Sequence, residues 1–212
     1  MGRLIVIEGL DGAGKRTLAD GLRDALAAVG ATVSRMAFPR YGRSVAADLV
    51  QDALYGRVGD LSESVYCMAA LYAFDRQGAA EELATELTSH DVVLLDRYVA
   101  SNAAYGAARL RQGADGEFVE WIRELEIERL KLPAPDRQLL LRVPPGVAAR
   151  RSIGRERDDV ARPRDTFEAD ADLQARVAAV YDELAAAGWL SPWTVLDGSA
   201  PIDYPALARE LR

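Results

Sequence analysis

The most constraining feature of the sequence is a glycine-rich turn that directly follows a short apolar run. Residues 4–7 are all aliphatic, and residues 9–17 then read Gly-Leu-Asp-Gly-Ala-Gly-Lys-Arg-Thr, in which Gly9, Gly14 and Lys15 fit the spacing G-x-x-x-x-G-K. A buried strand, such a turn and a following helix bring backbone N–H groups, a lysine charge and the positive end of a helix dipole to one point. We therefore predict a phosphate cradle rather than a plain glycine turn with a surface lysine.

One position departs from this pattern. The residue after the lysine is usually Ser or Thr, whose hydroxyl holds Mg²⁺. Here Arg16 stands in that place, and Thr17 follows one position late. The sequence thus predicts a phosphate site but leaves the set of metal ligands open.

Strands and helices alternate along the whole chain, with Gly and Pro between them. Four consecutive apolar residues at 92–95 are typical of a strand that is buried on both faces. We predict one α/β domain over residues 1–212, with a parallel sheet covered by helices on both faces and ligands at the carboxyl ends of its strands. The expected strands are 4–8, 32–38, 92–95, 139–143 and 194–196; the expected helices include 15–29, 45–54, one long helix at about 62–87, 98–112, 117–130, 146–153, 167–187 and 204–211.

Composition and charge narrow the possible partners and compartment. The 212 residues carry 26 Lys and Arg against 33 Asp and Glu, a net charge of −7, which disfavours general binding of nucleic-acid polymers or anionic membranes. No apolar run approaches the length of a membrane span, so we expect no membrane association. Cys67 is the single cysteine, which suits a reducing cytoplasm. His90 is the single histidine, so a histidine-based triad or metal site is improbable.

Charged residues follow the third predicted strand. Asp96 ends that strand, where a carboxylate beside a phosphate cradle can organise Mg²⁺ or its water shell. Arg97 comes next and can hold phosphate oxygens in a two-pronged hydrogen bond. The alternative is a structural ion pair between these two neighbours.

Polar groups recur on one face of the helix that follows. Arg97, Ser101 and Tyr105 are four residues apart, so they share a face that would otherwise be apolar. Asn102 can both donate and accept hydrogen bonds, which suits the edge of a nucleobase. We predict that this face lines a cleft.

The predicted long helix also carries a polar interruption. Its apolar stripe contains Arg76, four residues after Tyr72, and a ring with a guanidinium group could stack on a base and hydrogen-bond its carbonyl. The alternative is that Arg76 pairs with a buried carboxylate, for example Glu8 or Asp75.

Arginines are concentrated at about 150–165, mixed with acidic residues. We predict a lid that brings arginines onto a transferring phosphoryl group and excludes water, with Arg151 and Arg155 on one helix face. The alternative is a solvated charged loop. The arginines are Arg150, Arg151, Arg155, Arg157, Arg162 and Arg164.

Taken together, these residues resemble the thymidylate kinase family, P-loop enzymes that phosphorylate dTMP to dTDP. The resemblance covers nearly the whole chain, and the small Gly12 and Ala13 beside an arginine-rich lid are similar to the lid-arginine type usual in bacteria. It implies a three-layer α/β/α P-loop kinase fold with a five-stranded sheet, a role in dTTP synthesis, and a homodimer. Three motifs carry it: Glu8-Gly9-Leu10-Asp11-Gly12-Ala13-Gly14-Lys15, Phe38-Pro39-Arg40-Tyr41 and Asp96-Arg97-Tyr98-x-x-Ser101-x-x-Ala104-Tyr105.

The resemblance also implies roles at the phosphate end of the site. Lys15 and the loop amides would hold ATP, Asp11 would lie near the sugar 3′-hydroxyl, and Tyr41 and Arg97 would bind the acceptor phosphate. The implied ATP-binding residues are Gly9, Leu10, Asp11, Gly12, Ala13, Gly14, Lys15, Arg16 and Thr17. The implied catalytic residues are Asp11, Lys15, Arg97, Arg151 and Arg155, and the metal candidates for Mg²⁺ are Asp11, Asp96 and Glu168.

At the base end, the resemblance implies that Tyr72 stacks on thymine and that Arg76 and Asn102 read its edge. Pro39 would border the methyl group, and Tyr105 would crowd the 2′ position and disfavour ribose. The implied dTMP-binding residues are Asp11, Pro39, Tyr41, Tyr72, Arg76, Arg97, Ser101, Asn102 and Tyr105.

Two rival interpretations remain open at the level of sequence. The nearer is a kinase of the same fold that acts on another nucleotide or on a nucleoside. The other is a nucleotide-controlled switch or regulatory ATPase; a GTPase would be expected to carry an Asn-Lys-x-Asp motif, which the sequence lacks.

Overall fold

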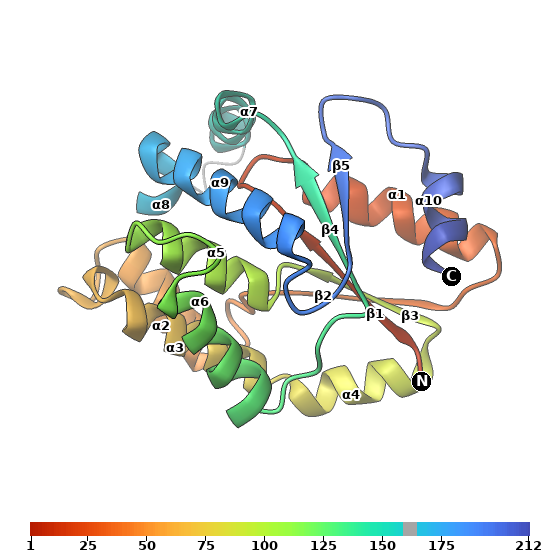
Figure 1. Ribbon diagram of the computed structural model, residues 1–212, viewed down its shortest axis with the longest axis horizontal. Helices are drawn as coiled ribbons and strands as arrows, with labels where there is room; N and C mark the ends of the chain where they lie inside the picture. The colour runs from red at the N-terminus through yellow and green to blue at the C-terminus, as the bar shows by residue number, and fades with distance from the viewer. Residues whose placement is uncertain (159–164) are drawn as a thin grey trace.

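The fold is built on a parallel sheet at its centre (Figure 1). The computed structural model describes residues 1–158 and 165–212, and the side chains of these residues except 155–158. Within them, five strands lie in the order β2-β3-β1-β4-β5. All five are parallel, as predicted. The strands are β1 (Arg3–Glu8), β2 (Val33–Ala37), β3 (Val92–Asp96), β4 (Arg137–Arg142) and β5 (Trp193–Asp197).

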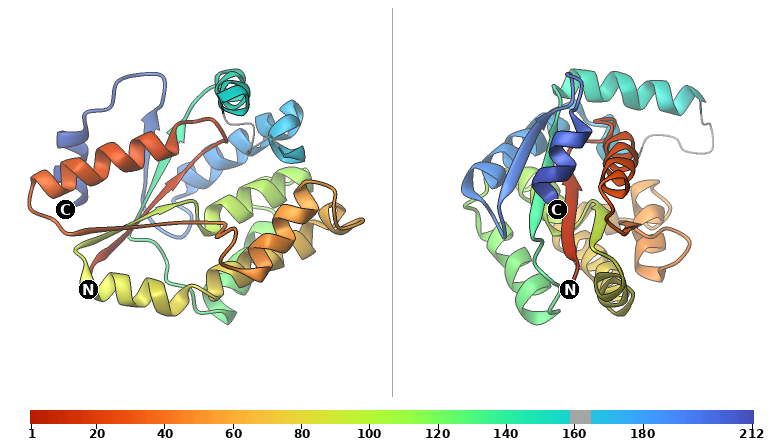
Figure 2. Two further views of the ribbon diagram at one scale, coloured as in Figure 1. Left: turned by 180° about the vertical axis from the view of Figure 1, so that it is seen from behind. Right: turned by 90° about the vertical axis from the view of Figure 1, so that its right-hand side faces the viewer.

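Helices cover both faces of the sheet, which gives the predicted three layers. Figure 2 (right) shows α1 and α4 on one side and α6 and α9 on the other; α5 packs along α9, and α10 packs on α1. The helices are α1 (Lys15–Ala28), α2 (Val45–Leu54), α3 (Val65–Gln77), α4 (Ala80–Ser89), α5 (Val99–Arg109), α6 (Glu117–Ile122), α7 (Pro145–Asp158), α8 (Thr166–Ala169), α9 (Ala171–Ala187) and α10 (Tyr204–Leu211), with a 3₁₀ turn η1 (Leu61–Glu63) and a π-helical segment η2 (Arg123–Arg129).

The core is centred on β1 and its two neighbours. Ile5, Val6 and Ile7 are fully buried, and β1 pairs with β3 and β4 along its length. Because both faces of these strands are covered, the aliphatic runs in the sequence need no polar alternation. A second, smaller apolar cluster lies between α2 and α3.

The prediction of a single long helix at about 62–87 is wrong. The chain there forms η1, α3 and α4 as separate segments. The side chain of Ser64 accepts a hydrogen bond from the backbone N–H of Cys67 (3.3 Å) and so caps the start of α3. Gly78 ends α3, and a Cβ there would lie 3.0 Å from Nη2 of Arg40, so the break allows close approach of the segment after β2.

Other boundaries differ at the carboxyl-terminal end of the chain. The helix predicted at 146–153 continues as α7 to Asp158, inside the predicted lid, and residues 159–164 lie outside the described residues. The helix predicted at 167–187 is divided at Asp170, whose side chain accepts a hydrogen bond from the N–H of Leu173 (2.9 Å) and caps α9. In the described part of the chain, no helix is long and apolar enough to cross a membrane.

Candidate active site

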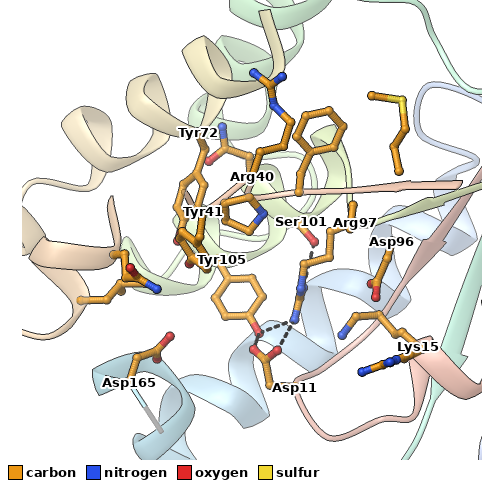
Figure 3. Close-up of a pocket in the computed structure, with 18 of the residues that line it drawn as sticks. Asp11, Lys15, Arg40, Tyr41, Tyr72, Asp96, Arg97, Ser101, Tyr105 and Asp165 are labelled. Carbon is orange, nitrogen blue, oxygen red and sulfur yellow. Dashed lines mark hydrogen bonds and ion pairs between the residues drawn. The ribbon is translucent and has the colours of Figure 1, made fainter. Parts of the chain in front are cut away.

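A cleft of about 1340 Å³ opens at the carboxyl ends of the central strands (Figure 3). Its walls come from the turn after β1, the segment after β2, and helices α3, α5 and α8. This is the place where open α/β sheets bind ligands. Residues far apart in the sequence therefore meet here as the parallel topology predicts.

The turn after β1 can be formed only by glycine at two points. Gly9 and Gly12 have φ of 142° and 78°, and a Cβ would lie 2.7 Å from the carbonyl oxygen of Leu141 at the first and 2.2 Å from that of Ala148 at the second. The backbone thus passes close to its neighbours here, which a side chain at either position would prevent. This turn, residues 9–17, is called the phosphate loop below.

Lys15 begins α1 and lies in the cradle, only 8 % exposed. Its Nζ donates hydrogen bonds to the carbonyl oxygens of Gly9 (3.2 Å) and Leu10 (2.9 Å). Burial is the main cause that lowers the pKa of Lys15 to about 8; the charge of Arg97 adds to the fall, and Asp11 opposes it. A phosphate entering the cradle would restore the charge that burial disfavours.

Asp11, Arg97 and Tyr105 form one network across the cleft (Figure 3). Asp11 accepts hydrogen bonds from Nη2 of Arg97 (2.7 Å) and from the hydroxyl of Tyr105 (2.8 Å). Arg97 also donates to Oγ of Ser101 (2.9 Å). The side chains of Arg97, Ser101 and Tyr105 meet as predicted, but they do not share a helix face, because Arg97 precedes α5. Arg97 pairs with Asp11 instead of its neighbour Asp96.

The charges of this network shift its pKa values in opposite directions. Burial by itself raises the pKa of Asp11, but the charges of Arg97 and Lys15 outweigh it, so that this pKa lies well below its ordinary value. Burial raises the pKa of Tyr105, and the negative charge of Asp11 raises it further. Asp11 is therefore an anion and Tyr105 a neutral hydroxyl across the physiological pH range.

Arg97 has an unusual backbone conformation. Its φ is 68°, in the left-handed region that costs an arginine about 1–2 kcal/mol. The backbone N–H bonds the carbonyl oxygen of Ile7 (2.9 Å), so the end of β3 is held to β1 at this point. Strain retained beside a cleft favours a functional role for the side chain it directs.

Glu8 is a fully buried carboxylate that sequence reasoning placed only in a motif and as a candidate partner of Arg76. It accepts hydrogen bonds from the backbone N–H of Tyr98 (2.9 Å), from Oγ of Ser101 (2.6 Å) and from the hydroxyl of Tyr181 (2.9 Å). Glu8 thus fixes the first turn of α5, which carries the cleft residues. The sequence feature that could have identified Glu8 is a carboxylate placed directly after an aliphatic run.

Arg76 does pair with a buried carboxylate, but with neither candidate named from the sequence. Its Nε and Nη2 donate to Oε2 and Oε1 of Glu126 (2.5 and 2.7 Å). Asp75 instead accepts from the backbone N–H and Nε of Arg40 (both 2.9 Å). Arg76 still lines the cleft, as does Asn102. Glu126 lies 50 residues away in the sequence, so no local pattern pointed to it.

The remaining predicted dTMP-binding side chains line the same cleft, whereas Gly9, Leu10, Ala13 and Thr17 of the predicted ATP-binding set are not among its lining residues. Pro39 and Tyr41 follow β2, and Tyr72 projects from α3 toward the same space (Figure 3). Asp165 was not predicted; it caps α8 through the backbone N–H of Phe167 (2.9 Å) and also faces the cleft. Burial, reinforced by the negative charge of Asp11, raises the pKa of Asp165 to about 6.

The candidate metal ligands do not form a ready-made cluster. In the described residues, no group of three His, Cys, Asp or Glu side chains is arranged to hold a metal ion. Asp96 has a buried Oδ1 without a hydrogen-bond partner in this part of the chain, and Glu168 accepts a hydrogen bond from Oγ of Ser152 (2.8 Å). Asp11, Asp96 and Glu168 all line the cleft. Magnesium binding through them stays a prediction.

The predicted lid is only partly described. Nη1 of Arg151, on α7, donates to the carbonyl oxygens of Ala13 in the phosphate loop (3.1 Å) and Gly198 (3.4 Å). The side chains of Arg155 and Arg157, and residues 159–164, lie outside what the structure describes. Arg151 thus contacts the phosphate loop, whereas the arrangement of the other lid arginines stays a prediction.

Comparisons with known proteins agree on one family. Residues 7–204 match the thymidylate kinase family profile. The chain is 52% identical over 208 residues to the thymidylate kinase of Mycobacterium tuberculosis (strain H37Rv), which covers 98% of this chain and 96% of that protein. It is 34% identical over 215 residues to the thymidylate kinase of Leifsonia xyli, and 40% identical over 156 residues to that of Xanthomonas oryzae, which covers 72% of this chain and 62% of the relative.

The chain belongs to the thymidylate kinase family. Its membership of this family confirms the predicted class of enzyme, a nucleoside monophosphate kinase, and the P-loop kinase fold. Within the described residues, the cleft brings together most predicted site residues of this thymidylate kinase family member: Asp11, Gly12, Gly14, Lys15, Arg16, Pro39, Tyr41, Tyr72, Arg76, Asp96, Arg97, Ser101, Asn102, Tyr105, Arg151 and Glu168.

Proposed function

We propose that this protein transfers the γ-phosphoryl group of ATP to dTMP, with dTDP and ADP as products. The observation that supports this most directly is the meeting of the phosphate loop with the Asp11–Arg97–Tyr105 network in one cleft. A donor phosphate in the loop and an acceptor phosphate on Arg97 would face each other there. Family membership supports the same reaction.

The proposed chemistry asks for alignment and charge neutralisation rather than covalent catalysis. A phosphate oxygen of dTMP attacks the γ-phosphorus, and the bond to the β-γ bridging oxygen breaks as negative charge moves onto ADP. Lys15 would leave the carbonyl oxygens of Gly9 and Leu10 to hold the ATP phosphates. Arg97 would hold the acceptor phosphate in a two-pronged hydrogen bond and offset the repulsion between two anions.

The nucleoside would lie along the opposite wall of the cleft. Tyr72 would stack on thymine, Pro39 would border its methyl group, and Arg76 and Asn102 would read its edge. The hydroxyl of Tyr105 is held by Asp11 (2.8 Å), so its ring has a fixed position in the cleft. There it would lie beside the sugar and exclude a 2′-hydroxyl. Tyr41 would contact the acceptor phosphate together with Ser101.

We propose Mg²⁺ as the metal that accompanies ATP. Carboxylate oxygens are the ligands that this ion prefers, and it is usually held by one or two of them together with substrate phosphates and water. Asp11, Asp96 and Glu168 would supply these oxygens, and Oδ1 of Asp96, which has no hydrogen-bond partner among the described residues, fits such a role. Bound Mg²⁺ would neutralise charge on the transferring phosphates. Arg16 would add a further positive charge at the loop.

Closure of the lid, residues 150–165, would complete the site. Arg151 is already held beside the phosphate loop by the carbonyl oxygen of Ala13. We infer that Arg151 and Arg155 neutralise the transferring group and that the lid excludes water from it.

We also propose that the chain works as one domain, in the cytoplasm, as a homodimer. The small residues Ala69, Ala73 and Ala103 on α3 and α5 are buried inside the protein and do not offer a contact surface. Tyr66 and Phe74 instead expose large apolar side chains on the outer face of α3 (42 and 49 %), and we assign the dimer contact to that face.

Product analysis tests the proposed reaction. The protein is incubated with Mg-ATP, with and without dTMP, and the nucleotides are separated and quantified. We expect ADP and dTDP in equal amounts, with little ADP when dTMP is absent. ATP hydrolysis that ignores dTMP would contradict the proposal and favour a nucleotide-controlled switch.

A further inference from the structure

A buried polar cluster lies behind the cleft, and the proposed mechanism does not yet account for its carboxylate. Glu126 is fully buried, and Arg76 and Asn102 are 3 and 6 % exposed. Oε1 of Glu126 accepts hydrogen bonds from Nη2 of Arg76 (2.7 Å) and Nδ2 of Asn102 (2.8 Å), and Oε2 accepts from Nε of Arg76 (2.5 Å). One carboxylate therefore holds both residues that line the base end of the cleft.

The cluster depends on an irregular helix. Glu126 lies in the π-helical segment η2, where the N–H of Leu130 bonds the carbonyl oxygen of Leu125 five residues earlier (2.9 Å). Such segments re-aim side chains and are frequent at functional sites. A buried ion pair is also weak as a stabilising device, because its desolvation offsets much of its attraction. Both points favour a role for Glu126 beyond stability.

Glu126 fixes which atoms of its two partners remain for a ligand. An ionised carboxylate only accepts hydrogen bonds, so each neighbour must turn a donor toward it. Asn102 directs Nδ2 at Glu126 and at the carbonyl oxygen of Ala69 (2.9 Å), which leaves Oδ1 as its free polar atom. Arg76 donates hydrogen bonds from Nε and Nη2 to Glu126, which leaves Nη1 as the donor for a ligand. In the described part of the chain, no hydrogen bond uses Asn102 Oδ1 or Arg76 Nη1.

The two free atoms are a hydrogen-bond donor, Nη1 of Arg76, and an acceptor, Oδ1 of Asn102. Thymine and uracil present a carbonyl oxygen at position 4 and an N–H at position 3, which complement that pair. Cytosine presents an amino group at position 4 and a bare nitrogen at position 3, so both of its contacts would be mismatched. A site whose polar groups are left unpaired rejects the wrong ligand strongly.

We propose that Glu126 is a positioning residue that sets the hydrogen-bond polarity of Arg76 and Asn102, and thereby selects imide bases over cytosine. This inference rests on the proposed placement of Arg76 and Asn102 at the base edge. Glu126 acts through these two side chains and touches neither the base nor the transferring phosphate.

The test is the isosteric variant Glu126→Gln, read by equilibrium binding of dTMP, dUMP and dCMP. A glutamine has one N–H₂ group, and in either orientation that group faces a donor of Arg76 or Asn102. We expect the Kd of dTMP and of dUMP to rise together by about tenfold, the loss of one charge-assisted contact, while the Kd of dCMP changes by less than about threefold. Turnover at saturating dTMP should change by less than about threefold, because the phosphate end is untouched.

Three further variants make the result decisive. Phe118→Leu loosens a buried ring of α6, just before η2, that lies outside the cleft, and should leave the dTMP-to-dCMP ratio unchanged. Glu126→Asp keeps an acceptor-only group and should retain that ratio even if all three nucleotides bind more weakly. Asn102→Ala should lower the ratio if the base-edge placement is right.

Each outcome bears on a different claim. Parallel losses for all three nucleotides in Glu126→Gln, or the same selective loss in Phe118→Leu, would overturn the positioning role. An unchanged ratio in Asn102→Ala would overturn the base-edge placement itself, and the inference with it. If Glu126→Gln shows no cooperative unfolding and so is not folded, the test rests on Glu126→Asp. Loss of the preference for dTMP over dCMP in that variant would by itself overturn the inference.

Discussion

Arg97 is held by side chains before any ligand arrives. Its left-handed backbone aims the guanidinium at Asp11 (2.7 Å), and Ser101 accepts from its other terminal nitrogen (2.9 Å). A phosphate would accept the same two-pronged hydrogen bond that these partners now receive. Little reorganisation is then needed on binding, which is the condition for efficient charge neutralisation in the transition state.

Arg97→Ala should therefore abolish most activity while the protein stays folded. We expect kcat/KM for dTMP to fall by on the order of a thousandfold, as for other arginines that stabilise phosphoryl transfer. Arg97→Lys keeps the charge without the fork and should recover part of the loss. Steady-state kinetics and thermal unfolding check both variants; near-normal turnover in Arg97→Ala would refute the assigned role.

Titration of Lys15 should make ATP binding by the free enzyme depend on pH in the alkaline range. Its pKa of about 8 means that the positive charge with which Lys15 would hold the ATP phosphates is lost as the pH rises through that value. Bound ATP adds negative charge and raises this pKa again. We expect kcat/KM for ATP to decline above pH 8, whereas kcat declines only at higher pH.

Rates at limiting and saturating ATP between about pH 7 and 10 test this prediction. Lys15→Arg serves as the control, because arginine keeps its charge over that range and should remove the decline in kcat/KM. A flat kcat/KM profile in the wild-type protein would contradict the lowered pKa.

At the scale of elements, local patterns predicted regular segments well and interruptions poorly. α2 was predicted at its observed bounds, and α1 ended within one residue of its predicted end. The break between α3 and α4 was missed because the apolar stripe continues across it: Ala79 and Leu83 remain buried beyond Gly78. The helix predicted at 117–130 is divided into α6 and the π-helical η2, and the helical pattern gave no sign of this change, so the role of Glu126 could be found only from the structure.

Gly106 on α5 is a residue whose replacement tests the packing between elements. A Cβ there would lie 2.0 Å from Cε1 of the buried Phe118, so α5 and α6 approach each other closely. Alanine at an interior helical position normally stabilises by about 1 kcal/mol relative to glycine. Here we expect Gly106→Ala to destabilise the protein by about 1–3 kcal/mol through overpacking.

Thermal unfolding measures this effect against a matched control. Gly154→Ala, in α7, adds a methyl group that has nothing within 4 Å among the residues the structure describes, and it should leave the unfolding temperature unchanged or slightly raised. A Gly106→Ala variant as stable as the wild-type protein would show that the α5–α6 contact can relax, and it would contradict the expected overpacking.

At the scale of the whole molecule, the parallel topology made the site predictable. Strands β1, β2 and β3 end at the same edge, so Lys15, Tyr41 and Arg97 meet although they lie far apart in the sequence. What could not be predicted is which charges pair. Arg97 with Asp11 and Arg76 with Glu126 are long-range choices made by packing, and the sequence offered nearer carboxylates for both.

The exposed face of α3 makes a prediction about assembly. We expect a dimer in solution, and Phe74→Glu should convert it to a monomer because a charge would be buried at the apolar contact. Val195→Glu changes another exposed apolar side chain, on β5, and should leave the dimer intact. Light scattering during size-exclusion chromatography reads both; a monomeric wild-type protein at micromolar concentration would contradict the assignment.

The proposed function requires that one cleft select a 2′-deoxy thymine monophosphate as phosphoryl acceptor. Its most direct test is kcat/KM with Mg-ATP for a panel of acceptors: dTMP, dUMP, UMP, CMP, AMP, GMP and thymidine. We expect kcat/KM for dTMP to far exceed that for the others, and that for UMP to lie below that for dUMP because the ring of Tyr105 would exclude a 2′-hydroxyl. Preference for another acceptor would keep the phosphate loop but contradict the roles given to Tyr72, Arg76 and Asn102.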